Sequence, residues 1–156
     1  MQIVSYFLVR NRLFVRANVC QLIRHTYSSM KRILVIDDHA KLRWVLRQIL
    51  EREGYEVAEA GDGKEGIELY HQAPADLIIT DVVMPEKDGV EIIRELKRDF
   101  PDVRVIAISG GSRTLDAQYC LAAMKALGAL YVLTKPFGRK ELLEAVHELL
   151  DSRAVR

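Results

Sequence analysis

Short apolar runs alternate with amphipathic segments along most of the chain. Five runs are predicted to be strands, and they cover residues 33–36, 55–59, 77–80, 103–109 and 129–133. The run over 33–36 is wholly apolar, as expected of a strand that is buried on both faces of a sheet. After each run, apolar residues recur at helical spacing. This spacing predicts helices over residues 42–50, 64–72, around 92–96, 114–127 and 139–150.

The order of these elements is a strand followed by a helix, repeated five times with short links. Strict alternation of this kind predicts a parallel sheet that is covered by helices on both faces, with right-handed crossovers. We therefore expect an α/β fold with a five-stranded parallel sheet, a doubly wound (βα)5 arrangement. A chain of 156 residues fits one such domain, which we expect over residues 30–152, with a short tail over 153–156.

Residues 1–29 differ in composition from the rest of the chain. They contain four arginines and no acidic residue, and they lack the apolar core and cleavage site of a secretory signal. A transit peptide and a basic helix on a membrane surface are two interpretations. A third is that translation starts at Met30, in which case residues 1–29 are an extension without function.

Charge and cysteine content exclude several classes of protein. The chain has 23 basic and 22 acidic residues, so that without the four N-terminal arginines the part from Met30 onward has a net charge of −3. This mildly acidic domain argues against a nucleic-acid-binding surface. Cys20 and Cys120 have no zinc-binding spacing, and no apolar run approaches the roughly 20 residues that span a bilayer.

Residues capable of chemistry follow four of the five predicted strands. Asp37 and Asp38 follow the first strand, Asp81 the third, Ser109 the fourth and Lys135 the fifth. Because ligands of open parallel sheets bind beyond the carboxyl ends of the strands, these side chains are expected to share one site.

This set of groups suits the transfer of a phosphoryl group. Clustered carboxylates repel one another unless a cation joins them, and oxygen ligands of this kind suit Mg²⁺, which also binds phosphate oxygens. A lysine and a hydroxyl can neutralise or donate to the remaining phosphate oxygens. A carboxylate can itself be the nucleophile and form an aspartyl phosphate.

Several short motifs occur in order, each at a predicted strand end or in the loop after it: Asp37-Asp38, Asp81, Met84-Pro85, Gly89, Ser109 and Lys135-Pro136-Phe137. Together they resemble the signature of bacterial response regulator receiver domains of the CheY-like, single-domain type, over about residues 31–150. The resemblance implies the flavodoxin-like strand order 2-1-3-4-5.

The resemblance also implies a role for each site residue. Asp81 is the expected phosphoacceptor, assisted by Lys135 and Ser109. The expected Mg²⁺ ligands are Asp37, Asp38, Asp81 and the main-chain carbonyl of Val83. Pro136 resembles the family's cis-proline. His39, beside the acid pair, is expected to be an exposed residue at the helix start rather than a ligand.

The function implied is that of a stand-alone response regulator in a phosphorelay. A histidine kinase or histidine phosphotransfer protein would donate the phosphoryl group, and an unknown protein target would receive the signal by contact. The resemblance implies a cytoplasmic monomer or weak dimer that binds neither nucleic acid nor membrane, and that is an enzyme only towards its own phosphorylation and dephosphorylation.

Three departures from the family pattern keep alternatives open. Val132 stands where the family usually has an aromatic switch residue, while Tyr131 is expected to face the other side of the sheet. The stretch from Ser109 to Lys135 is longer than usual for the family. In addition, the residue two positions after Asp81 is the apolar Val83. The alternative function is therefore a phosphate-independent interaction module. A haloacid dehalogenase-type phosphatase is a weaker alternative, because residues 37–40 lack its DxDxT motif.

Overall fold

The computed structural model describes residues 30–84, 89–110, 122, 125–126 and 128–151. Most of the helix predicted over 114–127, both predicted terminal segments and Pro85 lie outside these residues. The described elements are β1 (Arg32–Ile36), α2 (Ala40–Arg52), β2 (Glu56–Ala60), α3 (Gly63–Gln72), β3 (Leu77–Asp81), α4 (Gly89–Asp99), β4 (Val105–Ser109), β5 (Tyr131–Thr134) and α6 (Arg139–Asp151).

The five strands form one parallel sheet in the order β2-β1-β3-β4-β5, which confirms the predicted fold class and strand order. The chain leaves β1 outward to β2 and then returns across the sheet to β3. The chain therefore reverses direction in the sheet between β1 and β3, and ligands of open parallel sheets bind beyond the carboxyl ends of the strands at such a point.

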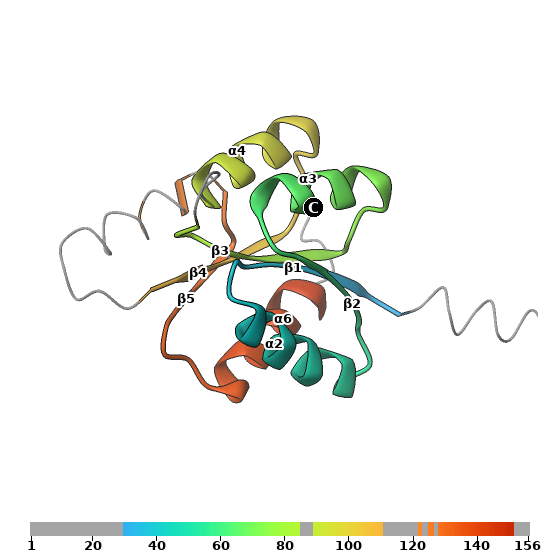
Figure 1. Ribbon diagram of the computed structural model, residues 1–156, viewed down its shortest axis with the longest axis vertical. Coiled ribbons are helices and arrows are strands. Elements are labelled where there is room, and N and C mark those ends of the chain that lie inside the picture. Colours follow the sequence, from blue (N-terminus) through green and yellow to red (C-terminus); the bar gives the residue numbers. More distant parts are fainter. Residues whose placement is uncertain (1–29, 85–88, 111–121, 123–124, 127, 152–156) are drawn as a thin grey trace, which may run out of the picture. The chain divides into compact units, whose positions relative to one another are not determined.

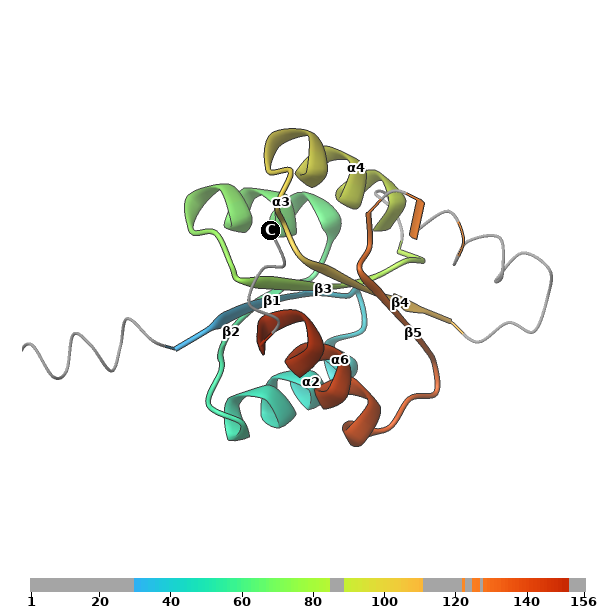
Figure 2. The ribbon, with the colours of Figure 1, turned by 180° about the vertical axis from the view of Figure 1, so that it is seen from behind.

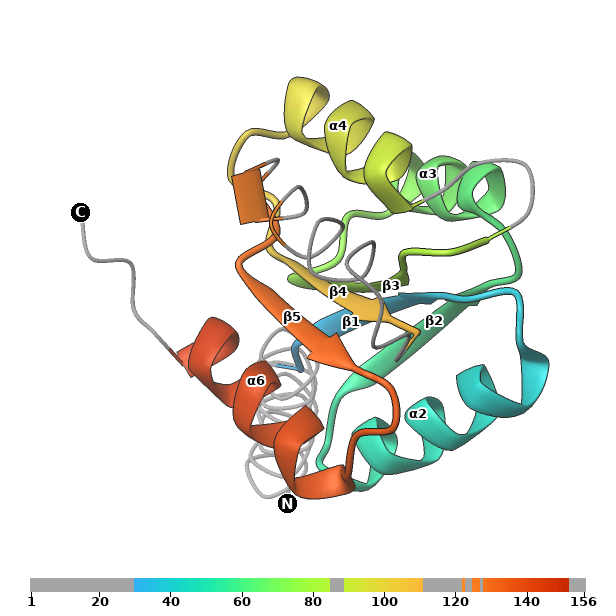
Figure 3. The same ribbon diagram turned by 90° about the vertical axis from the view of Figure 1, so that its left-hand side faces the viewer.

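Helices cover both faces of the sheet. Helices α3 and α4 lie on one face, and α2 and α6 lie on the other (Figures 1 and 2). Viewed along the sheet, β5 forms the nearer edge between these two layers (Figure 3). Strands β3 and β4 are fully buried, as expected for central strands covered on both faces.

Each face has its own apolar core, because successive side chains of a strand point to opposite faces. Leu34, Ile36 and Ile78 pack on the α3–α4 face. Ile33 and Val35 pack on the α2–α6 face. Glycine at position 66 permits close contact between α3 and the sheet, since a Cβ there would lie 2.5 Å from the side chain of Ile36.

Some strand boundaries differ from the predicted ones. The strand predicted from Val103 begins at Val105, because the N–H of Val103 donates to the carbonyl of Phe100 at 3.0 Å and closes a turn. Similarly, Gly128 adopts a positive φ of 100°, and this turn delays β5 to Tyr131.

Trp44, on α2, is 62% exposed. The buried positions of α2 are Leu46 and Leu50. Trp44 stands two positions before Leu46, and residues two positions apart lie on different sides of a helix.

The carboxylate of Asp76 links the starts of β1 and β3 at the amino edge of the sheet. Asp76 accepts hydrogen bonds from Lys31 Nζ at 2.7 Å and from the main-chain N–H of Arg32 at 2.9 Å. Burial alone would raise the pKa of Asp76, but these hydrogen bonds outweigh it and lower the pKa below its ordinary value.

We expect Asp76→Asn to be less stable than the wild type at neutral pH, by a margin that shrinks in acid. A depressed folded-state pKa adds stability above the unfolded-state pKa, and this stability is lost as the pH falls through the folded-state value. Urea unfolding between neutral and acid pH measures the margin, with the exposed Asp102→Asn as control. A margin that does not change with pH would contradict the assignment.

Candidate phosphoryl-transfer site

The loop after β1 carries the acid pair. Asp37 is fully buried, whereas Asp38 is exposed. The N–H of Asp37 donates to the carbonyl of Ala60 at 3.3 Å. His39 caps the start of α2 without a side-chain hydrogen bond, and its N–H donates instead to the Asp37 carboxylate at 2.7 Å. The start of α2 therefore orients one carboxylate of the pair.

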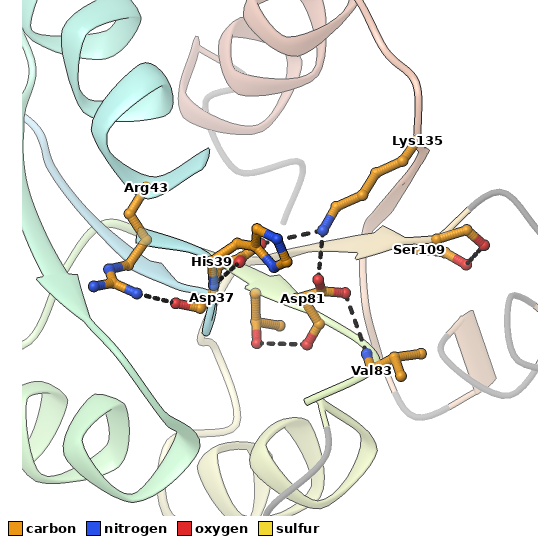
Figure 4. Close-up of polar contacts among 9 residues, drawn as sticks. Asp37, His39, Arg43, Asp81, Val83, Ser109 and Lys135 are labelled. Atoms are coloured by element: carbon orange, nitrogen blue, oxygen red, sulfur yellow. Dashed lines mark hydrogen bonds and ion pairs between the residues drawn. The ribbon is translucent and has the colours of Figure 1, made fainter. Parts of the chain in front are cut away.

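Asp81 is the last residue of β3 and is 6% exposed. One carboxylate oxygen accepts the N–H of Val83 at 3.2 Å, and the other accepts Lys135 Nζ at 2.5 Å. The hydroxyl of Thr80 donates to the main-chain carbonyl of Asp81 at 3.1 Å. The strand end thus fixes a buried carboxylate at the carboxyl edge of the sheet (Figure 4).

Lys135 joins the two buried carboxylates. It directly follows β5, where its N–H donates to the carbonyl of Ser109 at 2.8 Å, and its peptide bond to Pro136 is cis, as predicted. Its ammonium group lies 2.5 Å from Asp81 and 3.2 Å from Asp37. Residues almost one hundred positions apart in the sequence therefore meet in one ion-pair network (Figure 4).

Burial and charge act against each other in this network. Burial raises the pKa of Asp37 above its ordinary value, and the nearby Asp81 adds to the rise, although His39 and Lys135 oppose it. Burial alone would lower the pKa of Lys135, but its contacts with Asp81 and Asp37 outweigh burial and raise it. Lys135 is therefore charged at neutral pH.

Ser109 and Val83 border this network. Ser109 is the last residue of β4 and is 3% exposed, and its hydroxyl donates to the carbonyl of Gly110 at 3.4 Å. Among the described residues, the Ser109 side chain makes no hydrogen bond to the side chain of Asp81 or of Lys135. The side chain of Val83 is 70% exposed, two positions after Asp81, so an apolar group stands at the rim of the site.

The donor set fits a hard divalent cation. Ligand atoms of Asp37, Asp38 and His39 lie within 4.8 Å of one another, and Lys135 links Asp37 to Asp81. Three carboxylates against one lysine leave an excess of negative charge. Carboxylate oxygens suit Mg²⁺, whereas imidazole suits transition metals better. His39 is exposed and caps α2, as predicted.

Val132, at the family's switch position, and the neighbouring Tyr131 face opposite sides of the sheet, as predicted. Val132 packs against the core beneath α3 and α4, and Tyr131 packs against the core beneath α2 and α6. The aromatic ring therefore does not take the position that Val132 occupies.

Arg43 is a contact of the site that sequence reasoning missed. From the first turn of α2, its guanidinium donates to the main-chain carbonyl of Asp37 at 2.6 Å (Figure 4). The only feature of the sequence that indicates this contact is the position of Arg43 on the helix that follows the acid pair. Solvated arginines are common at such positions, so this signal is weak.

Comparisons with known proteins show which family the chain matches. Residues 33–147 match the family model of the response regulator receiver domain. The chemotaxis protein CheY of Thermotoga maritima is 35% identical over 121 residues, which are 76% of this chain and 97% of CheY. The DNA-binding transcriptional regulator NtrC of Azospirillum brasilense is 41% identical over 77% of this chain, but only 24% of NtrC is covered.

The similarity extends to solved structures. A CheY-like response regulator receiver domain protein from Methanospirillum hungatei superimposes with a TM-score of 0.72 at 31% identity, over 79% of this chain and 95% of that protein. Among the residues that the structure describes, no helix is both long and apolar enough to span a membrane.

Proposed function

Because the chain belongs to the response regulator receiver family, we propose that Asp81 accepts a phosphoryl group from a histidine kinase or a histidine phosphotransfer protein in a Mg²⁺-dependent reaction. The observation that carries the proposal is the buried Asp81 carboxylate at a strand end, paired with Lys135 at 2.5 Å and neighboured by a second buried carboxylate. A fixed, desolvated nucleophile opposite a cation suits phosphoryl transfer.

The reaction has one bond-forming and one bond-breaking event. An oxygen of Asp81 forms a bond to phosphorus while the bond from phosphorus to the donor's imidazole nitrogen breaks, and the electron pair of that bond stays on the imidazole. Lys135 neutralises charge on the phosphoryl oxygens. Ser109, at the end of the neighbouring strand, donates to another oxygen after its hydroxyl turns away from Gly110.

The proposed Mg²⁺ ligands are Asp37, Asp38, Asp81 and the carbonyl of Val83. Bound Mg²⁺ would neutralise the carboxylates and the developing charge on the phosphoryl group. Asp38 is exposed and open to the ion, whereas Asp37 and Asp81 are already paired with Lys135. Asp38 is therefore the ligand whose removal disturbs the remaining network least.

The signal is proposed to pass from the phosphorylated domain to a protein target by contact. In this proposal the receiver acts by itself, as a cytoplasmic monomer or weak dimer without nucleic-acid binding. In this scheme the protein catalyses only its own phosphorylation and dephosphorylation. Val132, in place of an aromatic switch residue, favours one second candidate, a phosphate-independent interaction module.

The test that separates these two candidates is the intact mass after incubation with a small phosphodonor such as acetyl phosphate and Mg²⁺. We expect a gain of one phosphoryl group that disappears when Mg²⁺ is chelated. No gain with Mg²⁺ present would favour the interaction module.

We expect Mg²⁺ to stabilise the wild type and not Asp38→Asn. A ligand that binds only the folded state adds about 2.7 kcal/mol when present at 100 times its Kd. Thermal unfolding with Mg²⁺ and with a chelator measures the effect. Because Asp38 is exposed, the variant should unfold like the wild type without Mg²⁺. Equal Mg²⁺ stabilisation of both proteins would remove Asp38 from the ligand set.

We expect Val83→Asn to shorten the lifetime of the phosphorylated protein. The exposed apolar side chain at the rim hinders the attacking water, whereas an amide can hydrogen-bond to it. The decay of phosphoprotein after removal of the donor gives the rate, with replacement of another exposed valine, Val45→Asn, as control. Fast decay of the wild type that is unchanged in Val83→Asn would contradict this role.

A further inference from the structure

Arg43 connects helix α2 to the loop that carries the acid pair. Its Nη1 atom lies 2.6 Å from the main-chain oxygen of Asp37, the short distance of a charge-assisted hydrogen bond. The side chain is 20% exposed, so that the contact is partly shielded from water. In Figure 4 the guanidinium lies on the opposite side of Asp37 from Lys135.

The peptide that Arg43 holds is the one that joins Asp37 to Asp38. Because a peptide unit is planar, fixing its oxygen also fixes the direction in which the backbone of Asp38 continues. Asp37 is held at its own N–H by Ala60 and at its carboxylate by His39 and Lys135. The exposed Asp38 depends on this peptide plane for its orientation.

Arg43 is itself anchored to the neighbouring strand. Its Nε atom lies 3.9 Å from the carboxylate of Glu59 on β2. Glu59 also pairs with Arg47 at 2.9 Å, and Arg47 pairs with Glu51 at 2.7 Å. Arg47 thus has the same charge, the same helix and the same partner as Arg43, but among the described residues it forms no hydrogen bond or ion pair with residues 37–39.

From this geometry we propose that Arg43 is a positioning residue for metal binding, which holds the Asp37–Asp38 peptide so that Asp38 faces the Mg²⁺ site. The inference rests on the proposed function. Partners that orient metal ligands contribute substantially to affinity, and their removal weakens metal binding by about 10-fold or more.

The test is an NMR titration of each full-length protein with Mg²⁺ alone, with no phosphodonor present. Arg43→Met removes the hydrogen bond and is expected to raise the Kd for Mg²⁺ about 10-fold. Arg43→Lys keeps a cationic donor and is expected to raise it by a smaller factor. Arg47→Met, the matched control, should bind Mg²⁺ like the wild type.

A second readout separates positioning from a general loss of structure. At saturating Mg²⁺, the phosphorylation rate of Arg43→Met should return to that of the wild type, because only the ion's affinity has changed. A lower rate at every Mg²⁺ concentration would indicate damage to the fold instead and would overturn the proposal. If Arg43→Met does not fold, the Kd of Arg43→Lys for Mg²⁺ tests the proposal by itself, and a Kd equal to that of the wild type would overturn it.

The outcomes distinguish this inference from the proposed function. A wild type that binds no Mg²⁺ would overturn both. A wild type that binds Mg²⁺, together with Arg43 variants that bind it equally well or more tightly, would overturn the positioning role alone. Tighter binding would mean that Arg43 acts on the ion as a repelling charge. Equal weakening by Arg47→Met would likewise overturn it.

Discussion

Asp81→Asn takes up no phosphoryl group under any condition that phosphorylates the wild type. The amide has the shape of the carboxylate but lacks the anionic oxygen that attacks phosphorus, so the loss is complete rather than partial. Lys135 retains Asp37 as its ion-pair partner, and the variant is expected to fold. Gel mobility or intact mass after incubation with phosphodonor and Mg²⁺ measures the uptake.

Asp62→Asn provides the matched control for this loss. Asp62 lies after β2 at the same edge of the sheet, and it is exposed. Its side chain caps α3 by accepting the N–H of Glu65 at 2.8 Å, a role that asparagine fills equally well. Full uptake by Asp81→Asn would show that another residue receives the phosphoryl group, and loss of uptake in Asp62→Asn would show an effect of charge alone.

Gly89→Ala loses both stability and phosphoryl uptake. A Cβ at position 89 would lie 2.5 Å from the main-chain oxygen of Asp81 and 2.9 Å from the Cα of Val82. Both contacts are to backbone, which no change of rotamer relieves. The clash is expected to cost about 1–3 kcal/mol of the free energy of unfolding, and because relief moves Asp81, uptake falls with it.

Urea unfolding and phosphoryl uptake, measured on the same preparation, test this prediction. Gly61→Ala is the control, because a Cβ there would meet its nearest neighbour, the Glu65 carboxylate, at an ordinary 3.6 Å. If Gly89→Ala matched the wild type in both measurements, the close approach of α4 to the end of β3 would be wrong.

The fold was predictable because short apolar runs in the sequence mark the strands. Ile33–Ile36 and Leu77–Thr80 are apolar on both faces, which is typical of central parallel strands, and the helices between them keep a regular spacing. The strand order came from the resemblance, because the alternation of strands and helices alone does not fix which strands are neighbours. The starts of β4 and β5 were misplaced, since turn hydrogen bonds at Val103 and Gly128 take the first apolar residues out of the sheet.

The sequence predicted which residues lie close together in the site, but not which side chains contact one another. Parallel strands bring their carboxyl ends together, so the positions of Asp37, Asp81 and Lys135 in sequence predict their proximity. That Lys135 contacts both carboxylates at once depends on side-chain reach. The contact of Arg43 depends on a side chain that turns back from a helix to the loop before it, and spacing alone does not predict such a contact.

The site of phosphorylation in the wild type tests the central claim most directly. The protein would be incubated with acetyl phosphate and Mg²⁺, the aspartyl phosphate trapped by borohydride reduction, and the modified residue located by peptide mass spectrometry. We predict a single modified residue, Asp81, and none when Mg²⁺ is chelated. A phosphoryl group on any other residue, or none with Mg²⁺ present, would contradict it.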